Sequence, residues 1–500
     1  MFRIFGALAA AALFALPSSA SAFCGFYVSG ADGSLYANAT MVVMMRSGNQ
    51  TVLSMQNNYQ GPPEDFAMVV PVPVVLSEEN VKTLPHEIFQ HVDALAAPRL
   101  VEYWEQDPCW EPEYETSGGA DEGMMYPSAA MAPEATEDLG VTIEAQFQVA
   151  EYDIVILSAR DSSGLDTWLR RERYNIPRGA ETVLRAYVEE GTKFFVAKVD
   201  AQRVTFQNGQ AALSPLRFNY DSERFSLPVR LGLLNSNGTQ DLIVHVLAPN
   251  LRFEVANYPN AFIPTNLVVA DAVRQSFASF YEALYQATID AHQGAVITEY
   301  AWAAGSCDPC PTPSLDPSEI QLLGNDVIGA DVWSMVLTRL HYRYDADGLG
   351  ADLVFREADG VIGGTGIPDA QGHVSQDLQH GSSNMFQGRY IILNPWEGDL
   401  DCRSPNRGQW GGPPSGHTPA PMAATNTALG GQAPQPIGNL AALVTGPVTT
   451  ISVEGSAEPL QLEGSSGGCA SCEAGYGGGA WASLFGFGLL IALLYRRRLG

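Results

Sequence analysis

Lysine is scarce in this chain of 500 residues, and positive charge is scarce with it. The lysines are Lys82, Lys193 and Lys198, and 27 lysines and arginines stand against 55 aspartates and glutamates, for a formal net charge of −28. Nucleic acids are bound by clustered lysines and arginines that replace the counterions of the phosphates. The charge balance therefore excludes nucleic acid as a partner.

The sequence also lacks internal repeats, and its long apolar runs are confined to the two ends. Without a repeat of about 20–50 residues, a propeller or a solenoid is not expected. Because 46% of the residues are apolar, the chain is rich enough in core-forming side chains to fold. Its length allows two or three domains, each with its own core.

The N-terminal 22 residues have the pattern of a secretory signal peptide. Arg3 precedes an apolar run over residues 4–16, and small residues follow up to Ala22. This order of a basic start, a short apolar stretch and a small-residue end is typical of a cleaved signal. We therefore expect processing between Ala22 and Phe23, and an exported mature chain.

Two alternatives for this end stay open. The apolar run could remain as an anchor, although it is shorter than the roughly 20 residues that cross a bilayer. Cys24 could carry a lipid, but the residue before it, Phe23, is bulky where a small one is wanted.

At the other end, residues 480–495 form an apolar run with aromatic flanks. Trp481 and Tyr495 occupy positions suited to the membrane interface, and the run stops at an arginine cluster, Arg496, Arg497 and Arg498. Arginines at the end of an apolar helix keep that end in the cytoplasm. We expect one transmembrane helix here, which makes the membrane a partner; a buried C-terminal helix is the alternative.

Cys469 precedes this run in a glycine-rich segment. The order of cysteine, apolar run and arginine cluster over residues 469–500 resembles the C-terminal surface-sorting tags of myxobacteria (the MYXO-CTERM type). The resemblance implies that an envelope sorting or processing enzyme acts at Cys469 and is a second partner. A plain tail anchor with a cysteine-bearing stalk is the alternative.

Composition divides the rest of the chain. Residues 23–110 and 141–403 alternate strand-like runs with helical spacing, which predicts two α+β lobes with mostly antiparallel sheets and several packed helices. Residues 111–140 form an acidic low-complexity loop or linker between them. Residues 404–468 are rich in Gly, Pro, Ala and Thr, which predicts an extended stalk.

Local periodicity predicts several elements inside these lobes. Residues 84–105 have helical spacing that is interrupted near Pro98. Residues 181–190 predict a helix, and residues 193–199 predict the strand that follows it. Residues 271–287 place their large apolar side chains along one face of a helix.

Short motifs spread over most of residues 23–402 share one pattern. They are Phe23-Cys24-Gly25-Phe26-Tyr27-Val28, Asn58-Tyr59-Gln60-Gly61, Ala97-Pro98-Arg99-Leu100, Asp107-Pro108-Cys109, Cys307-Asp308-Pro309-Cys310 and Phe386-Gln387-Gly388-Arg389-Tyr390. Together they resemble the bacterial domain of unknown function 2330 family. The resemblance implies an exported or surface protein and assigns no activity.

No catalytic, cofactor-binding or metal site is predicted. His86 and His91 suggest a zinc-peptidase helix, but ligands on one helical face must be four residues apart and these are five apart. Asp345 and Asp347 begin a calcium-like loop whose twelfth position is arginine, so an ordinary turn is favoured. The Gly-x-Ser-x-Gly at residues 464–468 lies in the stalk, without a strand or helix to form a nucleophile elbow.

Five cysteines precede the stalk, and an exported chain favours their oxidation. We expect the disulfides Cys24–Cys109 and Cys307–Cys310, with Cys402 left over or competing for one of these partners. The Cys307–Cys310 pair is favoured as structural. Thiol exchange is the alternative, because a C-x-x-C at a helix start makes its first thiol nucleophilic.

The sequence thus favours an exported, surface-tethered ectodomain with a binding or structural role and no cofactor. The rival is an exported enzyme, either a thiol oxidoreductase using Cys307 and Cys310 or a hydrolase. For the hydrolase we expect His245 or His341 to share a pocket with acidic residues.

Overall fold

The computed structural model describes residues 26–27, 39–56, 67–109, 140–172, 174, 176, 179–200, 202–207, 210–235, 238–414, 423–424, 436–452 and 457–462. The fold is mixed α+β, as expected, and is built mostly of sheets. Most strand pairs within the described ranges are antiparallel; the parallel ones are β14–β2, β16–β18, β17–β24, β21–β23 and β24–β6.

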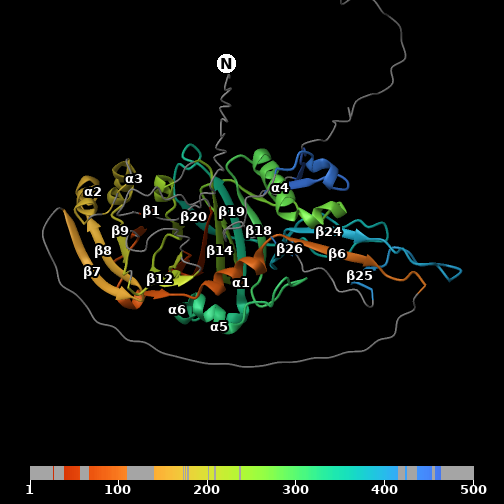
Figure 1. Ribbon diagram of the computed structural model, residues 1–500, viewed down its shortest axis with the longest axis horizontal. Coiled ribbons are helices and arrows are strands. Elements are labelled where there is room, and N and C mark those ends of the chain that lie inside the picture. Colours follow the sequence, from red (N-terminus) through yellow and green to blue (C-terminus); the bar gives the residue numbers. More distant parts are fainter. Residues whose placement is uncertain are drawn as a thin grey trace, which may run out of the picture. The chain divides into compact units, whose positions relative to one another are not determined.

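A large sheet of thirteen strands runs through the described part of the chain (Figure 1). Its main path is β22 (Gln379–Gly381), β21 (Gly360–Gly363), β23 (Met385–Gln387), β18 (Val296–Ala303), β19 (Met335–Tyr344), β14 (Gln240–Pro249), β2 (Ala39–Ser47), β3 (Gln50–Met55), β12 (Leu216–Asp221) and β5 (Val81–Thr83). Off this path, β16 (Asn260–Phe262) joins β18 to β27 (Thr449–Ser452) and β28 (Ala457–Pro459).

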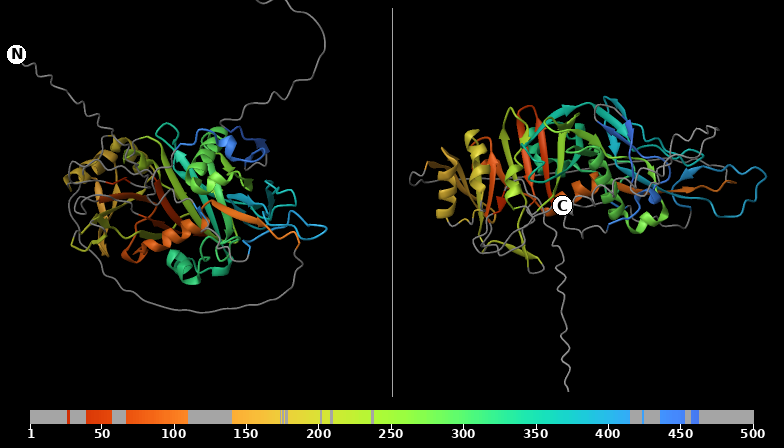
Figure 2. Two further views of the ribbon diagram at one scale, coloured as in Figure 1. Left: turned by 45° about the vertical axis from the view of Figure 1, so that its right-hand side comes forward. Right: turned by 90° about the horizontal axis from the view of Figure 1, so that it is seen from above.

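A second sheet is covered by two helices (Figure 2). Its strands are β1 (Phe26–Tyr27), β4 (Ala67–Val72), β9 (Lys193–Val199), β8 (Tyr152–Ala159) and β7 (Val141–Val149). The helices α2 (Ser162–Arg171) and α3 (Ala180–Glu189) bury Leu165, Leu169 and Leu184 against it. These elements confirm the helix expected at residues 181–190 and the strand expected at residues 193–199.

The remaining strands of the described ranges belong to smaller sheets. One contains β17 (Leu267–Val268), β24 (Arg389–Asn394), β6 (Arg99–Glu105) and β25 (Trp410–Gly411), with β26 (Ala423–Ala424) also on β6. Another contains β13 (Ser226–Leu227), β20 (Leu353–Ala358) and β15 (Arg252–Val255), and a hairpin joins β10 (Thr205–Gln207) to β11 (Gln210–Ala212).

Two helices pack near the centre of the large sheet. The helix α1 (His86–Ala96) buries Ile88, Phe89 and Val92 against strand residues that include Tyr300 and Leu337. The helix α4 (Phe277–Ala291) buries Phe280 and Leu284 in a separate cluster. Shorter helical turns are η2 (Glu78–Asn80), η3 (Arg230–Asn235), η4 (Asp271–Gln275), α5 (Pro317–Ile320), η5 (Gln321–Asn325), α6 (Asp326–Ile328), η6 (Val332–Ser334) and η7 (Leu440–Leu443).

The expected division into two lobes is wrong for the described residues. Strands from residues 23–110 and from residues 141–403 alternate within the same sheets: β14 pairs with β2, β9 with β4, and β24 with β6. The backbone groups of each stretch are therefore hydrogen-bonded to the other stretch. Either stretch alone would leave strand N–H and C=O groups without partners. Of the acidic segment between them, residues 110–139 lie outside the described part.

Two further expectations are corrected. The helical spacing expected to continue to residue 105 ends with α1, and β6 follows because β24 pairs with it in parallel. The stalk is not extended throughout, because η7, β27 and β28 lie within residues 404–468. Leu440 and Val448 are 2% and 3% exposed there and pack in the same cluster as α4.

The helices of the described ranges include none that is long and apolar enough to cross a membrane. The transmembrane helix expected at residues 480–495 lies outside those ranges.

Candidate functional site

The strand β19 carries a row of basic residues on one face. Its side chains alternate between the two faces of the sheet, so Arg339, His341 and Arg343 point to the same side. The antiparallel register places His245 opposite Arg339 and Asp241 opposite Arg343 on the neighbouring strand β14. Helices α1 and α4 both reach this face, since Arg339 contacts α1 and His341 contacts α4 (Figure 1).

A β-bulge in β18 adds an acidic residue to the same face. The register between β18 and β19 shifts between Thr298 and Tyr300, which makes Glu299 the extra residue. A bulge redirects the side chains beside it. Here Glu299 Oε2 lies 2.6 Å from Nε of Arg339, and Glu299 Oε1 lies 2.8 Å from Nδ1 of His341.

The contacts continue from β19 to β14 and to α4. Nε2 of His341 lies 3.1 Å from Asp241 Oδ1, and Nε of Arg343 lies 2.7 Å from the same oxygen. Nη1 of Arg343 also lies 2.7 Å from Glu282 Oε1 on α4, where Glu282 is about one third exposed. The network therefore runs from the buried sheet centre to the protein surface.

Helix residues close the buried end of this network. Asp93 of α1 accepts a hydrogen bond from Arg339, and Tyr281 of α4 donates one to Glu299. The ring of Tyr285 stacks on His341 with the centroids 3.9 Å apart and the planes within 15°. Asp93 and Glu299 are 0% exposed as a result.

We call the six residues of this network the charge cluster: Asp93, Asp241, Glu299, Arg339, His341 and Arg343. It holds three carboxylates and, when His341 is protonated, three cations. Both ring nitrogens of His341 face carboxylate oxygens, and only an imidazolium donates from both. The geometry therefore favours the protonated ring, which balances the formal charges of these six residues; Glu282, which pairs with Arg343 at the surface, is a further carboxylate beside them.

The pKa directions agree with this charge balance. Burial opposes protonation of His341, but the charge of Glu299 and the hydrogen bond to Asp241 outweigh it and raise the pKa of the ring. Burial also opposes ionisation of Glu299 and Asp241, yet the facing cations lower both carboxyl pKa values to about 2.

Asp93 and His245 behave differently because burial dominates. Burial raises the pKa of Asp93, whose Oδ2 makes no hydrogen bond within the described residues. Burial and the positive charge of Arg339 lower the pKa of His245 far below its ordinary value. The ring of His245 is thus neutral, with Nε2 4.0 Å from Asp93 Oδ1.

The charge cluster satisfies part of the expectation for a hydrolase. His341 does meet acidic partners, and His245 lies near one. Within the described part of the chain neither ring is open to solvent, because the two histidines are at most 1% exposed. A general base needs a ring nitrogen free to take a proton from a substrate, and both nitrogens of His341 are engaged. The cluster is arranged to hold β14, β18, β19, α1 and α4 together.

Three of the sequence motifs meet at the loop that carries Cys307 and Cys310. Arg99 of β6 donates to the carbonyl of Pro309 over 2.9 Å, and Gln387 of β23 donates to the carbonyl of Asp308 over 2.5 Å. Arg99 and Gln387 are 0% and 1% exposed. Burial lowers the pKa of Arg99 to about 10, which leaves its guanidinium charged at neutral pH.

Cys307 and Cys310 form a disulfide, as expected. The other expected pairing is wrong, because Cys109 bonds Cys402 across a separation of 293 residues. The strands β6 and β24 explain the change: they pair in parallel and bring the residues after each strand to the same edge of the sheet. Cys24 lies outside the described residues.

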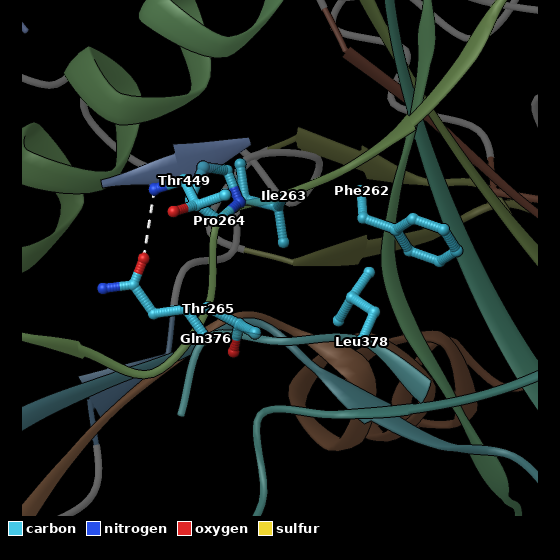
Figure 3. A pocket seen from close by; sticks show the side chains of 7 residues that line it. All are labelled: Phe262, Ile263, Pro264, Thr265, Gln376, Leu378 and Thr449. Carbon is cyan, nitrogen blue, oxygen red and sulfur yellow. Dashed lines mark hydrogen bonds between the residues drawn. The ribbon is translucent and has the colours of Figure 1, made fainter. Parts of the chain in front are cut away.

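A small hollow lies elsewhere in the described structure, beside β16 and β27 (Figure 3). It encloses no space for a water-sized molecule and is lined by Phe262, Ile263, Pro264, Thr265, Gln376, Leu378 and Thr449. Gln376 Oε1 accepts a hydrogen bond from the Thr449 backbone across it. No charged side chain lines the hollow, so it offers no acid, base or metal ligand.

The remaining candidate positions divide into two groups. His91 is engaged in the fold, with Nδ1 2.5 Å from Glu319 Oε1, and the described residues contain no group of three or more metal-ligating side chains. The processing and anchor residues lie outside the described ranges: Ala22, Phe23, Cys469, Trp481, Tyr495, Arg496, Arg497 and Arg498.

Sequence reasoning did not find Asp93, Asp241, Glu299, Arg339 or Arg343 as site residues. A signal was present, since arginine, histidine and arginine alternate at positions 339, 341 and 343 of an otherwise mostly apolar strand. Period-two charges in a buried strand indicate that acidic partners lie across from them.

One comparison with known proteins found a family. A family model described as "Uncharacterized protein conserved in bacteria", that of the domain of unknown function 2330, matches residues 18–356. The match includes the loop of Cys307 and Cys310 and ends before the motif at residues 386–390. Comparisons with curated proteins and with solved structures gave no match.

Proposed function

Because the chain belongs to the bacterial domain of unknown function 2330 family, whose name assigns no activity, we propose its role from its own residues: it is an exported envelope protein with a binding or structural function. The observation that carries the proposal is the disulfide between Cys109 and Cys402, which joins the segments that follow two paired strands. Such bonds persist in oxidising compartments outside the cytosol.

The charge cluster supports a role other than catalysis. Its acidic and basic side chains neutralise one another. Four of them, Asp93, Glu299, Arg339 and His341, are only 0–1% exposed. Titratable groups of an active site need access to a substrate. The cluster instead joins β14, β18, β19, α1 and α4 through buried ion pairs, which is a structural role.

The proposed tether is the C-terminal segment. The apolar run at residues 480–495 inserts in the membrane, and an envelope enzyme recognises Cys469 as part of a surface-sorting tag. This part rests on hydropathy and on the order of cysteine, apolar run and arginines.

The test is cell fractionation with mass spectrometry of both mature termini. We expect the protein in the envelope fraction, beginning at Phe23, with Cys109 and Cys402 oxidised. Recovery of a reduced chain that still carries Met1 in the soluble cytosolic fraction would refute export. Recovery of an exported chain with an intact, soluble C-terminus would refute the tether alone.

An exported enzyme is the second candidate, favoured by the solvent exposure of Cys310. A catalytic C-x-x-C gains its low thiol pKa from a helix that starts at the motif. Here the residues after Cys310 form a bend and irregular backbone, and the next helix, α5, begins only at Pro317. A Cys307–Cys310 potential more oxidising than about −200 mV would favour the enzyme.

A further inference from the structure

The loop of Cys307 and Cys310 is held by contacts that do not depend on its disulfide. Its base is closed by a hydrogen bond from the Leu315 amide to the Ala304 carbonyl, and Leu315 is 1% exposed. Between these two residues, side chains from three elements distant in the sequence form hydrogen bonds with backbone carbonyls of the loop.

Those three side chains form a cradle: Arg99 of β6, Gln387 of β23 and His91 of α1. Arg99 holds the carbonyl of Pro309, Gln387 that of Asp308, and Nε2 of His91 lies 2.7 Å from the carbonyl of Pro313. The loop backbone is therefore fixed on both sides of Cys310. Opening the sulfur–sulfur bond breaks none of these contacts.

The two sulfur-bearing residues differ in access. Cys310 is exposed, whereas Cys307 is partly buried and packs against the cluster that contains α1. Thiol attack on a disulfide needs access along the bond to the sulfur that is attacked. Attack from solvent is thus favoured at Cys310, with Cys307 as the leaving sulfur.

We propose that the Cys307–Cys310 disulfide is a reversible thiol-exchange site that takes electrons from a dithiol, with the first attack at Cys310 Sγ. The proposal goes beyond the envelope role and does not rest on it. It describes a redox modification of this chain, in which the dithiol is the co-reactant.

The exchange proceeds in two balanced steps. A thiolate of the dithiol bonds to Cys310 Sγ while the bond between Cys310 and Cys307 breaks, and Cys307 leaves as a thiolate that takes a proton from water. The second thiolate of the reductant then attacks the first sulfur of the reductant, which is bonded to Cys310 in the mixed disulfide. Cys310 is released as a thiolate and is protonated in turn. Two electrons reach the protein, and the dithiol becomes a disulfide.

The second disulfide provides an internal comparison. Cys109–Cys402 closes a separation of 293 residues and Cys307–Cys310 one of 3. In the chain-entropy description, the factor by which a disulfide raises the folding equilibrium constant grows as about the 1.5 power of loop length. For the longer bond this factor is therefore roughly a thousandfold larger than for the shorter one. Reduction at Cys307–Cys310 should therefore leave the protein folded.

The experiment titrates the purified full-length protein with dithiothreitol, traps free thiols with a maleimide mass tag and maps them by peptide mass spectrometry. We expect Cys307 and Cys310 to open at a dose at least about tenfold below that for Cys109 and Cys402, with the circular dichroism unchanged. Simultaneous opening of both disulfides, or loss of native signal as the loop opens, would overturn the proposal.

The site of attack is tested with two variants, each of which lacks one cysteine of the pair, and the remaining thiol is reacted with oxidised glutathione. Cys307→Ser leaves the exposed thiol and should react at least about tenfold faster than Cys310→Ser, which leaves the partly buried one. If either variant fails to fold, reduced glutathione is added to the oxidised wild-type protein, its thiolate attacks the Cys307–Cys310 disulfide, and the mixed disulfide is mapped. Its location at Cys307, or equal rates for the two variants, would refute attack at Cys310.

The cradle is tested by reoxidation. Gln387→Ala removes the hydrogen bond to Asp308 and should slow closure of the reduced disulfide severalfold, because the thiols are held together less firmly. Gln376→Ala is the matched control, since its side chain contacts Pro447 and Thr449 and not the loop. Unchanged closure in folded Gln387→Ala would show that the cradle does not position the cysteines.

Discussion

Replacing His341 with glutamine tests the charge cluster most directly. Glutamine has a similar reach but no charge, and its amide cannot donate from both ends as the imidazolium does. Glu299 and Asp241 would each lose a cation at 2.8 Å and 3.1 Å. Three carboxylates would then face two arginines, and two of these carboxylates, Asp93 and Glu299, are 0% exposed.

The size of the effect follows from the burial. Two unit charges about 4 Å apart attract by about 4 kcal/mol at the effective dielectric constant of about 20 found in proteins. Removing one partner of a buried ion pair costs about 3–5 kcal/mol, since the other charge stays buried. We expect His341→Gln to lower the free energy of unfolding by about this amount near pH 6.

The pH dependence gives this prediction its sign. The folded-state pKa of His341 is raised, so its contribution is complete below the ordinary value of about 6.5 and is lost as the pH rises through the folded value. Glu299 and Asp241 act in the opposite sense: their pKa values of about 2 give stability that is lost as the pH falls from about 4. The difference between wild type and variant should be largest at about pH 5–6.

Urea denaturation of both proteins from pH 5 to pH 9 measures this difference. The matched control is His373→Gln, because His373 is 78% exposed and 3.5 Å from the exposed Asp369. We expect the control to unfold like wild type at every pH. A loss below about 1 kcal/mol for His341→Gln, or a loss that does not change between pH 5 and pH 9, would refute a charged His341.

Three further predictions concern single contacts. Tyr281→Phe removes the hydroxyl that donates to Glu299 and should lower the free energy of unfolding by about 1.5–3 kcal/mol, measured by urea denaturation; no change would mean that the hydroxyl is dispensable. Arg339→Met leaves the Glu299 carboxylate short of a cation and should cost about 3–5 kcal/mol in the same assay, and a gain in stability would contradict this. Cys402→Ser frees Cys109 and should cost about 2–5 kcal/mol in oxidised protein; with reductant present, the variant and wild type should unfold alike.

Local sequence was enough to predict several elements and the fold class. The strand at residues 193–199 and the helix at residues 181–190 lie where the periodicity places them. The helix expected at residues 271–287 begins as the turn η4 and continues as α4 to Ala291. These elements follow from side chains a few residues apart, which a short window contains.

Local sequence was misleading where a distant strand decided the conformation. Residues 99–105 form β6 because β24, almost three hundred residues later, supplies its hydrogen bonds. Leu440 and Val448 pack with α4, although the segment around them is rich in Gly, Pro and Ala. Tertiary contacts override weak local propensity in both cases.

By itself the sequence determined the charge balance, the apolar ends, the short elements and the alternation of Arg339, His341 and Arg343. Tertiary structure alone decided which carboxylates meet those cations and which cysteine meets Cys109. The reason is register: Asp93, Asp241 and Glu299 come from a helix, a neighbouring strand and a bulge. The hydrogen bonds between distant segments set their positions, and a one-residue shift would turn each strand's side chains to the opposite face.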